Sequence, residues 1–353
     1  MPQIDALLEE LLKNKGSDLH LIAGDPPRVR RYGDLAPLRS EILTPDFVKE
    51  TLYEIMPRKA IERFEAHDGA DFAYAMAGHG RFRVNVLRQI AGMGAVFRAI
   101  PSSALTLEQL KMPPAVHNLC RSSNGLILVT GKTGSGKSTS LAAMIDEINK
   151  RIKGHIITVE DPIEFVHPRH NCLISQREIG AHTPSFSSAL LSALREDPDV
   201  ILVGELRDLE TMSTAITAAE MGILVMATLH TNGAAPTVDR MVNAFPADKQ
   251  THVRTMLSTS LRGVISQQLL QRSDGQGRVA ALEILINTPA SANLIRQGKL
   301  DQIETVMQSG GALGMRTMDM AIQTLYDQGL VSGAEAYKKA INKAKFEPVK
   351  DQR

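Results

Sequence analysis

A glycine-rich segment at residues 131–138 carries the strongest chemical signal in the chain. Its sequence, GKTGSGKS, fits the pattern G-x-x-x-x-G-K-[S/T], in which successive backbone N–H groups converge on phosphate oxygens. The apolar run Leu126–Thr130 precedes it and a helical pattern follows it, so a helix N-terminus would add partial positive charge. Lys137 is expected to bridge the β- and γ-phosphates of a nucleoside triphosphate, and the Ser138 hydroxyl to bind Mg²⁺. The residues expected to bind the nucleotide are Gly131, Thr133, Gly134, Ser135, Gly136, Lys137, Ser138 and Thr139.

Carboxylates follow two further apolar runs, where a metal ion or a reacting water would need them. One run ends in Glu205, which we expect to hold the water shell of Mg²⁺, so Ser138 and Glu205 are the predicted metal-site residues. The segment TVEDPIE at 158–164 places three carboxylates within five positions, which is costly unless metal, water or cations share the charge. We assign this segment to water activation, with Glu160 or Glu164 as the catalytic carboxylate; the spacing leaves that choice open.

A histidine and several arginines complete the candidate catalytic groups. His230 lies two positions after the apolar run Leu224–Thr228, at the expected end of a strand. Ligands of parallel α/β sheets bind at the carboxyl ends of the strands. We therefore expect His230 to sense the γ-phosphate. Phosphoryl transfer also needs cationic charge beyond Lys137 and Mg²⁺, which an arginine of a neighbouring subunit often supplies. The candidate arginines are Arg81, Arg83 and Arg98 in the first hundred residues, and Arg195, Arg207 and Arg240 further along.

The elements that would position these groups form a parallel sheet. Short continuous apolar runs, each followed by a helical pattern, are typical of parallel strands covered by helices on both faces. After about residue 255 we expect a helical C-terminal region, because Met256–Leu270 and 316–328 carry apolar residues at helical spacing. The expected strands are Leu126–Thr130, Ile156–Glu160, Val200–Gly204 and Leu224–Thr228.

The first hundred residues have a different pattern and predict a small α+β domain. Phe82, Val84 and Val86 alternate with polar residues, which is the period of a half-buried antiparallel strand. Arg81 and Arg83 share the polar face of that strand, and a simple solvated face remains the alternative to a catalytic role. Prolines bracket residues 101–115, which we interpret as the interdomain connection.

Composition excludes several classes of protein. The 353 residues carry 40 Lys+Arg and 39 Asp+Glu, a net charge of +1, which argues against broad nucleic-acid binding. Two cysteines, Cys120 and Cys172, are too few for a disulfide scaffold or a four-thiolate zinc site. No apolar run approaches the ~20 residues of a membrane span, and residues 1–16 predict an amphipathic helix rather than a signal peptide. We therefore expect a cytoplasmic protein that reaches a membrane only through a partner.

Taken in order, the motifs resemble the four boxes of the secretion-superfamily ATPases. Within that superfamily the chain resembles the type IV pilus retraction ATPases, PilT and its paralogue PilU, over residues 4–330. The segments that carry this second resemblance are GSDLHL (16–21), RFRVN (81–85), VFRAIP (96–101), SQREIG (175–180) and GMRTMD (314–319).

This resemblance implies a ring-shaped homo-hexamer that binds ATP and Mg²⁺. Each subunit would have a PAS-like N-terminal domain at 1–100 and a RecA-like P-loop ATPase domain at 116–353, with N-domain arginines completing the site. The implied partners are an inner-membrane pilus platform protein and a paralogous retraction ATPase, with no nucleic acid, so the protein would be peripheral at the inner membrane. The implied catalytic residues are Glu160 and Glu164 of the Asp box, the Walker B residue Glu205, the His-box residue His230, and Arg83 and Arg98.

The chain departs from the retraction ATPases at two points. Lys132 stands where the phosphate box has proline, a change expected on the solvent side. Ala292 replaces the first arginine of the family's AIRNLIR segment, although Arg296 remains, and the flanking 285–289 and 294–300 look closer to PilU. The alternatives to a retraction motor are therefore an accessory ATPase that assists the main motor, a pilus-assembly or secretion ATPase, and a nucleic-acid motor, for which 4% aromatic residues leave little stacking surface.

Overall fold

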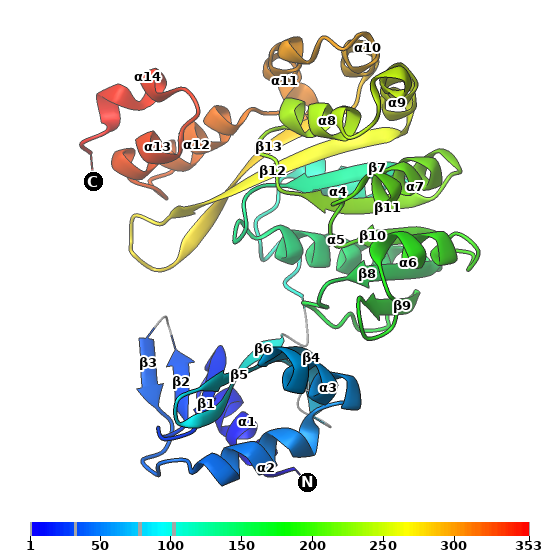
Figure 1. Cartoon of the computed structure of the whole chain (residues 1–353). Coiled ribbons are helices and arrows are strands. Elements are labelled where there is room, and N and C mark those ends of the chain that lie inside the picture. Colours follow the sequence, from blue (N-terminus) through cyan, green and yellow to red (C-terminus); the bar gives the residue numbers. More distant parts are fainter. Residues whose placement is uncertain (1, 32–33, 77–79, 101–103, 353) are drawn as a thin grey trace. The chain divides into compact units, whose positions relative to one another are not determined.

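An antiparallel sheet of six strands organises the N-terminal part of the chain (Figure 1). In the computed structural model, which describes residues 2–31, 34–76, 80–100 and 104–352, its strand order is β3-β2-β1-β6-β5-β4. Its elements are α1 (Gln3–Lys13), β1 (Asp18–Ile22), β2 (Arg28–Arg31), β3 (Asp34–Pro37), α2 (Pro45–Ile55), α3 (Arg58–His67), β4 (Gly69–Met76), β5 (Gly80–Gln89) and β6 (Gly92–Ile100).

The expected alternation in β5 is confirmed. Phe82, Val84 and Val86 are buried, while Arg83 and Asn85 are exposed. Thr44 caps α2 by accepting a hydrogen bond from the N–H of Phe47, as Thr-Pro-Asp predicts for a helix start. One face of this sheet therefore packs on the helices, and the other presents polar side chains.

A seven-stranded sheet organises the rest of the chain, in the order β13-β12-β7-β11-β10-β8-β9. Its neighbours pair in parallel except β12 and β13, which form an antiparallel hairpin. The strands are β7 (Gly125–Thr130), β8 (His155–Glu160), β9 (Leu173–Glu178), β10 (Val200–Val203), β11 (Leu224–Leu229), β12 (Leu261–Gln271) and β13 (Arg278–Ile286).

Helices cover both faces of this sheet, as expected for parallel strands. Leu126 and Leu128 of β7 pack with α6 to α9, whereas Ile127 and Val129 pack with α4 and α5. The α-helices in this part of the chain are α4 (Pro114–Cys120), α5 (Lys137–Arg151), α6 (Phe186–Ala193), α7 (Leu209–Glu220), α8 (Ala234–Asn243), α9 (Ala247–Ser260), α10 (Pro289–Gln297), α11 (Ile303–Ser309), α12 (Met318–Asp327), α13 (Gly333–Lys339) and α14 (Lys343–Phe346). Short 3₁₀ turns occupy η1 (Leu300–Gln302), η2 (Gly311–Leu313) and η3 (Glu347–Val349).

The helical C-terminal region expected from about residue 255 is wrong in its first part. Helix α9 ends at Ser260, and the predicted helix Met256–Leu270 continues instead as β12, which pairs in parallel with β7. Its apolar residues fit both a helical and a strand spacing, and the unpaired edge of β7 decided between them. Gly263 fits this strand closely, because a Cβ there would lie 2.8 Å from the carbonyl oxygen of Leu285. The second expected helix, at 316–328, is confirmed as α12.

The chain divides into two compact units of unequal size. One comprises Met1–Ser103 and Glu164–Val166, and the other comprises Ala104–Ile163 and His167–Arg353. Residues 101–103, where the interdomain connection was expected to begin, lie outside the described residues.

Cys120 and Cys172 are buried and free. Burial raises the pKa of the Cys120 thiol to about 12, so it is an unreactive core side chain. Among the described residues no helix combines the length and the apolar composition that crossing a bilayer demands.

Candidate functional site

The phosphate loop, residues 131–138, follows β7 and leads into α5, as the sequence predicts. Gly131 and Gly136 have φ angles of +139° and +89°, a region that side chains rarely adopt. Contacts exclude a side chain as well, since a Cβ on Gly131 would lie 2.3 Å from the carbonyl oxygen of Gln267. Lys132 is exposed, as expected, so the residue that replaces proline points to solvent.

Two side chains of this loop have hydrogen-bonding groups that suit a phosphate. The Lys137 ammonium donates hydrogen bonds to two carbonyl oxygens of its own loop, that of Gly131 at 2.9 Å and that of Lys132 at 3.2 Å. The Ser135 hydroxyl is buried, and among the described residues it has no hydrogen-bond partner. A buried unpaired hydroxyl at a helix N-terminus fits an anion, because an oxygen acceptor would satisfy it. The loop therefore fits a nucleotide phosphate.

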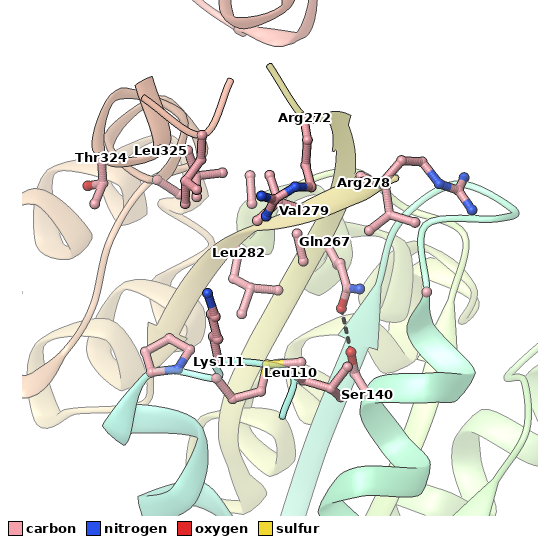
Figure 2. Close-up of a pocket in the computed structure, with 18 of the residues that line it drawn as sticks. Leu110, Lys111, Ser140, Gln267, Arg272, Arg278, Val279, Leu282, Thr324 and Leu325 are labelled. Carbon is pink, nitrogen blue, oxygen red and sulfur yellow. Dashed lines mark hydrogen bonds between the residues drawn. The ribbon is translucent and has the colours of Figure 1, made fainter. Parts of the chain in front are cut away.

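Gln267 of β12 holds this loop in place through two hydrogen bonds, and it is not among the residues predicted from the sequence. Its buried amide donates to the carbonyl oxygen of Ser135 at 2.7 Å and accepts from the Ser140 hydroxyl at 2.7 Å. Figure 2 shows the Gln267 side chain pointing at Ser140 on the first turn of α5. The segment had been predicted as a helix, which hid the alternation that aims Gln267 at the loop.

The predicted catalytic groups Glu205 and His230 lie together at the carboxyl ends of β10 and β11. His230 Nε2 is 3.1 Å from Glu205 Oε1, and Arg207 Nε is 2.7 Å from Glu205 Oε2. Arg207 also lies 3.7 Å from Asp161 of the Asp box. The hydrogen bond to Glu205 raises the pKa of Arg207, so this guanidinium stays charged and offsets both carboxylates. Arg207, one of the six candidate arginines, thus belongs to the carboxylate cluster.

Glu160 ends β8, the strand next to β10, and is held by polar neighbours. Its Oε1 accepts from the Thr158 hydroxyl at 2.6 Å and from the Gln176 amide at 3.3 Å. The other candidate carboxylate, Glu164, groups with the N-terminal unit, so the two candidates lie in different units. Glu178, at the end of β9, is a buried carboxylate that accepts the N–H of Ile163 and holds the Asp box in place. Glu178 is not among the site residues predicted from the sequence; it lies in segment 175–180, which supports only the resemblance to the pilus retraction ATPases.

The predicted arginines Arg83 and Arg98 face each other across β5 and β6 in the N-terminal unit. Arg98 Nε is 2.7 Å from Asp18, a buried carboxylate on β1, and Arg83 lies 3.7 Å from Asp71 on β4. Both guanidinium groups are largely exposed, so this sheet face presents a pair of cations from fixed positions.

A cavity of about 580 Å³ opens beside the phosphate loop, between α5, the β12–β13 hairpin and α12 (Figure 2). Leu110, Leu282 and Leu325 contribute apolar surface, and Arg272 and Arg278 add positive charge. Gly136 of the phosphate loop and Thr139 on the first turn of α5 also line this space, so a ligand bound to the loop can extend into the cavity. Its mixture of apolar walls and a few polar groups is typical of a small-molecule site.

The chain is similar to members of one protein family over most of its length. The family described as Type II/IV secretion system protein matches residues 1–323. The type IV pilus retraction ATPase PilT of Pseudomonas aeruginosa is 51% identical over 96% of this chain and 98% of its own. The type IV pilus ATPase PilU of the same organism is 41% identical over 95% of this chain and 87% of its own. A crystal structure of the pilus retraction motor PilT with bound ADP matches at a TM-score of 0.91 and 44% identity, covering 99% of each chain.

Proposed function

The chain belongs to the family of Type II/IV secretion system proteins and is an ATPase, and we propose that it drives retraction of a type IV pilus by hydrolysing ATP. The observation that supports hydrolysis best is the contact of Glu205 with His230, at 3.1 Å, on the same sheet edge as the phosphate loop. The similarity to PilT over nearly the whole chain supports the retraction role.

In the proposed reaction a water attacks the γ-phosphorus and gives a proton to a carboxylate of the Asp box, while the bond from the γ-phosphorus to the β–γ bridging oxygen breaks and ADP leaves. Glu160, at the end of β8, is one candidate for this carboxylate, and Glu164 is the other. Lys137 leaves its two carbonyl partners to bind the β- and γ-phosphates, and His230 binds the γ-phosphate. Ser138 and Glu205 fit Mg²⁺, because a hydroxyl and a carboxylate are ligands it prefers; when bound, the ion would neutralise developing charge on the phosphates.

We also propose that the base and ribose of ATP occupy the cavity beside the loop. The cavity begins at Thr139 and Ser140, and its leucines offer apolar surface to a purine. Arg272 and Arg278 would lie along its polar side.

The proposed assembly is a homo-hexamer in which the arginines of the N-terminal unit complete the site. Arg83 and Arg98 are suited to this because their guanidinium groups are exposed and held in register on one sheet face. The proposed organisation is a PAS-like domain at 1–100, a connection at 101–115, and a RecA-like domain at 116–353. The ring would act on an inner-membrane platform protein from the cytoplasmic side, with a paralogous ATPase as a further partner.

A Glu205→Gln variant tests this function. We expect purified wild-type protein to release phosphate from ATP in a Mg²⁺-dependent way, and the variant to lose roughly 10²-fold in kcat while nucleotide affinity stays within a few fold. In cells of a piliated host the variant should fail to restore surface motility to a deletion strain. Absence of phosphate release by the wild type would remove the ATPase assignment, and restored motility with the inactive variant would remove the role of hydrolysis in retraction.

A second candidate, an accessory retraction ATPase, rests on helix α10. Ala292 stands where the retraction ATPases have arginine, while Arg296 contacts the Ser258 hydroxyl at 3.4 Å. The higher identity to PilT than to PilU, 51% against 41%, favours the main motor. A deletion strain separates the two: lost motility with excess pili indicates the main motor, and lost motility with normal pilus numbers indicates the accessory role. Stimulation of turnover by single-stranded DNA would favour a nucleic-acid motor instead.

A further inference from the structure

Glu283 is a buried carboxylate that joins two helices by their first residues. It lies on β13 with 5% of its surface exposed. Its Oε1 accepts the N–H of Ala234, the first residue of α8, at 2.6 Å, and its Oε2 accepts the N–H of Met318, the first residue of α12, at 3.1 Å. Each helix N-terminus carries a partial positive charge, which favours an anion there.

Stability alone is a poor explanation for this carboxylate. Burial raises the pKa of Glu283 above its usual value, and the two amides oppose that shift only in part. Within the described part of the chain no cation forms an ion pair with it. A buried, unpaired carboxylate is costly to the fold, so its two directed hydrogen bonds point to a positioning task.

One of the two helices begins directly after the loop that carries His230. Ser266 on β12 pairs with Glu283 on one side and with Thr130 on the other, so three polar residues form a row across the sheet. Ser266 accepts the N–H of Gly233 at 2.8 Å. The row therefore fixes the His230–Gly233 loop at its end, next to the last residue of β7 before the phosphate loop.

The same row is anchored through the hydroxyl of Thr237 on α8. This hydroxyl lies 2.7 Å from that of Thr231 and 3.4 Å from that of Thr130. All of these contacts are buried or half-buried, so the loop, the start of α8 and the end of β7 shift as one body if they shift at all.

The other helix belongs to a small core that also includes Leu270 of β12 and Ala281 of β13. Met318, Ala321 and Ile322 of α12 pack with Val331, Ala336 and Phe346 of the segments that follow. Asp319, beside Met318, is a second buried carboxylate, and it accepts the N–H groups of Ile341 and Asn342 at 2.8 and 3.0 Å. The C-terminal helices α12 to α14 are thus tied to one another and packed on the β12–β13 hairpin, and Glu283 connects the first turn of α12 to the start of α8.

We propose that Glu283 is a positioning residue that couples the His230 loop to the C-terminal helices α12–α14. When the loop responds to the terminal phosphate, the start of α8 moves, and the carboxylate transmits that movement to the start of α12. This coupling rests on the proposed hydrolysis of ATP, because it assigns a route by which that reaction reaches the C-terminal helices.

The experiment compares two buried carboxylates of equal chemistry in the full-length protein. Glu283→Gln keeps the shape but turns one acceptor into an N–H₂ group, which cannot accept the second amide. Asp319→Asn does the same within the C-terminal helices and leaves the His230 loop untouched. For each protein we would measure thermal stability, kcat and KM for ATP, and amide hydrogen exchange at 318–322 with and without Mg²⁺-ADP or a non-hydrolysable ATP analogue.

Coupling predicts that Glu283→Gln lowers kcat roughly tenfold at nearly unchanged KM, the size expected from losing one hydrogen bond to a charged group. It also predicts that the nucleotide-dependent change in exchange at 318–322 disappears in this variant and persists in Asp319→Asn. If both variants lower stability equally and neither changes kcat or the exchange response, Glu283 is merely structural and the proposal is wrong.

Two further arms keep the outcome decisive. If Glu283→Gln does not fold, Ser266→Ala releases Gly233 at small cost in volume and should also abolish the exchange response; an intact response would contradict the coupling. If wild-type protein binds the non-hydrolysable ATP analogue but releases no phosphate from ATP, the proposed function fails, while the difference in exchange between the analogue and ADP still decides whether the two regions are coupled.

Discussion

The phosphate loop and the carboxylate–histidine edge lie on one sheet but are held in opposite ways. The loop is held by backbone and by buried amide contacts, with Lys137 only 8% exposed and Gln267 only 3%. The edge is held by ion pairs among partly exposed side chains, with Arg207 57% and His230 45% exposed. Buried hydrogen bonds are expensive to break, whereas exposed ion pairs contribute little and are screened by salt. The difference indicates a preformed binding half and a hydrolytic half that rearranges readily.

The largest effect should come from removing the Lys137 ammonium group from the phosphate loop. We expect Lys137→Ala to lower turnover at least roughly 10²-fold, because no other cation of the loop can replace it at the β- and γ-phosphates. Phosphate release and calorimetric nucleotide binding measure this. Lys132→Ala is the matched control, since Lys132 is exposed in the same loop and should leave both nearly unchanged. Wild-type turnover in Lys137→Ala would show that the loop is misassigned.

A histidine change should affect the hydrolytic half alone. We expect His230→Asn to reduce kcat by roughly 10² while nucleotide affinity changes little, since the loop that binds the phosphates is braced from the other side. Single-turnover kinetics with a fluorescent nucleotide would separate the two quantities. His252→Asn, an exposed histidine on α9, serves as control. A parallel fall in affinity and kcat would mean that the two halves are not separable.

Removing the brace should weaken binding more than chemistry. Gln267→Met loses both amide contacts, to Ser135 and Ser140, and we expect nucleotide affinity to fall by roughly tenfold. The neighbour Gln268 is only half-buried, so Gln268→Met should have little effect. Equal affinities in the two variants would contradict a preformed loop.

The smallest effect concerns stability near the Asp box. Burial lowers the pKa of His167 from 6.5 to about 4, and its backbone N–H donates to Gln176. Since the unfolded chain binds the proton more readily, stability is full above pH 6.5 and falls as the pH drops toward 4. At pH 5 this amounts to about 2 kcal/mol relative to pH 7. Urea unfolding of His167→Gln should show a flatter pH dependence between these values, with ATP turnover at pH 7 unchanged; an identical slope would refute the assignment.

The parts that followed from sequence are those with local causes. The pattern at 131–138 dictates a loop because glycines must adopt positive φ, and continuous apolar runs dictate strands buried on both faces. Because parallel strands end at one edge of a sheet, the positions of Glu205 and His230 at strand ends predict that they lie close together. Their contact at 3.1 Å agrees with that reasoning.

The parts that did not follow depend on partners distant in the chain. The segment 256–270 was expected as a helix, and its part from Leu261 onward became β12 because β7 offered an unpaired edge. With that error, the alternation that aims Ser266 at one loop and Gln267 at the other stayed hidden. Glu283 was missed because a lone carboxylate in an apolar run shows its partners only after folding, and Glu178 because it ends the polar segment 175–178, where a carboxylate fits a solvated strand end equally well.

By itself the sequence determined a phosphate-binding loop on a parallel sheet, a small antiparallel sheet with arginines on one face, and a set of strand-end carboxylates. Tertiary structure decided what holds and connects them: Gln267 meets Ser140 and Ser135 across 127 and 132 positions of chain. The physical reason is that backbone conformation is encoded by neighbouring residues, whereas a buried polar contact requires segments far apart in the chain to be brought together by the folded sheet and its helices.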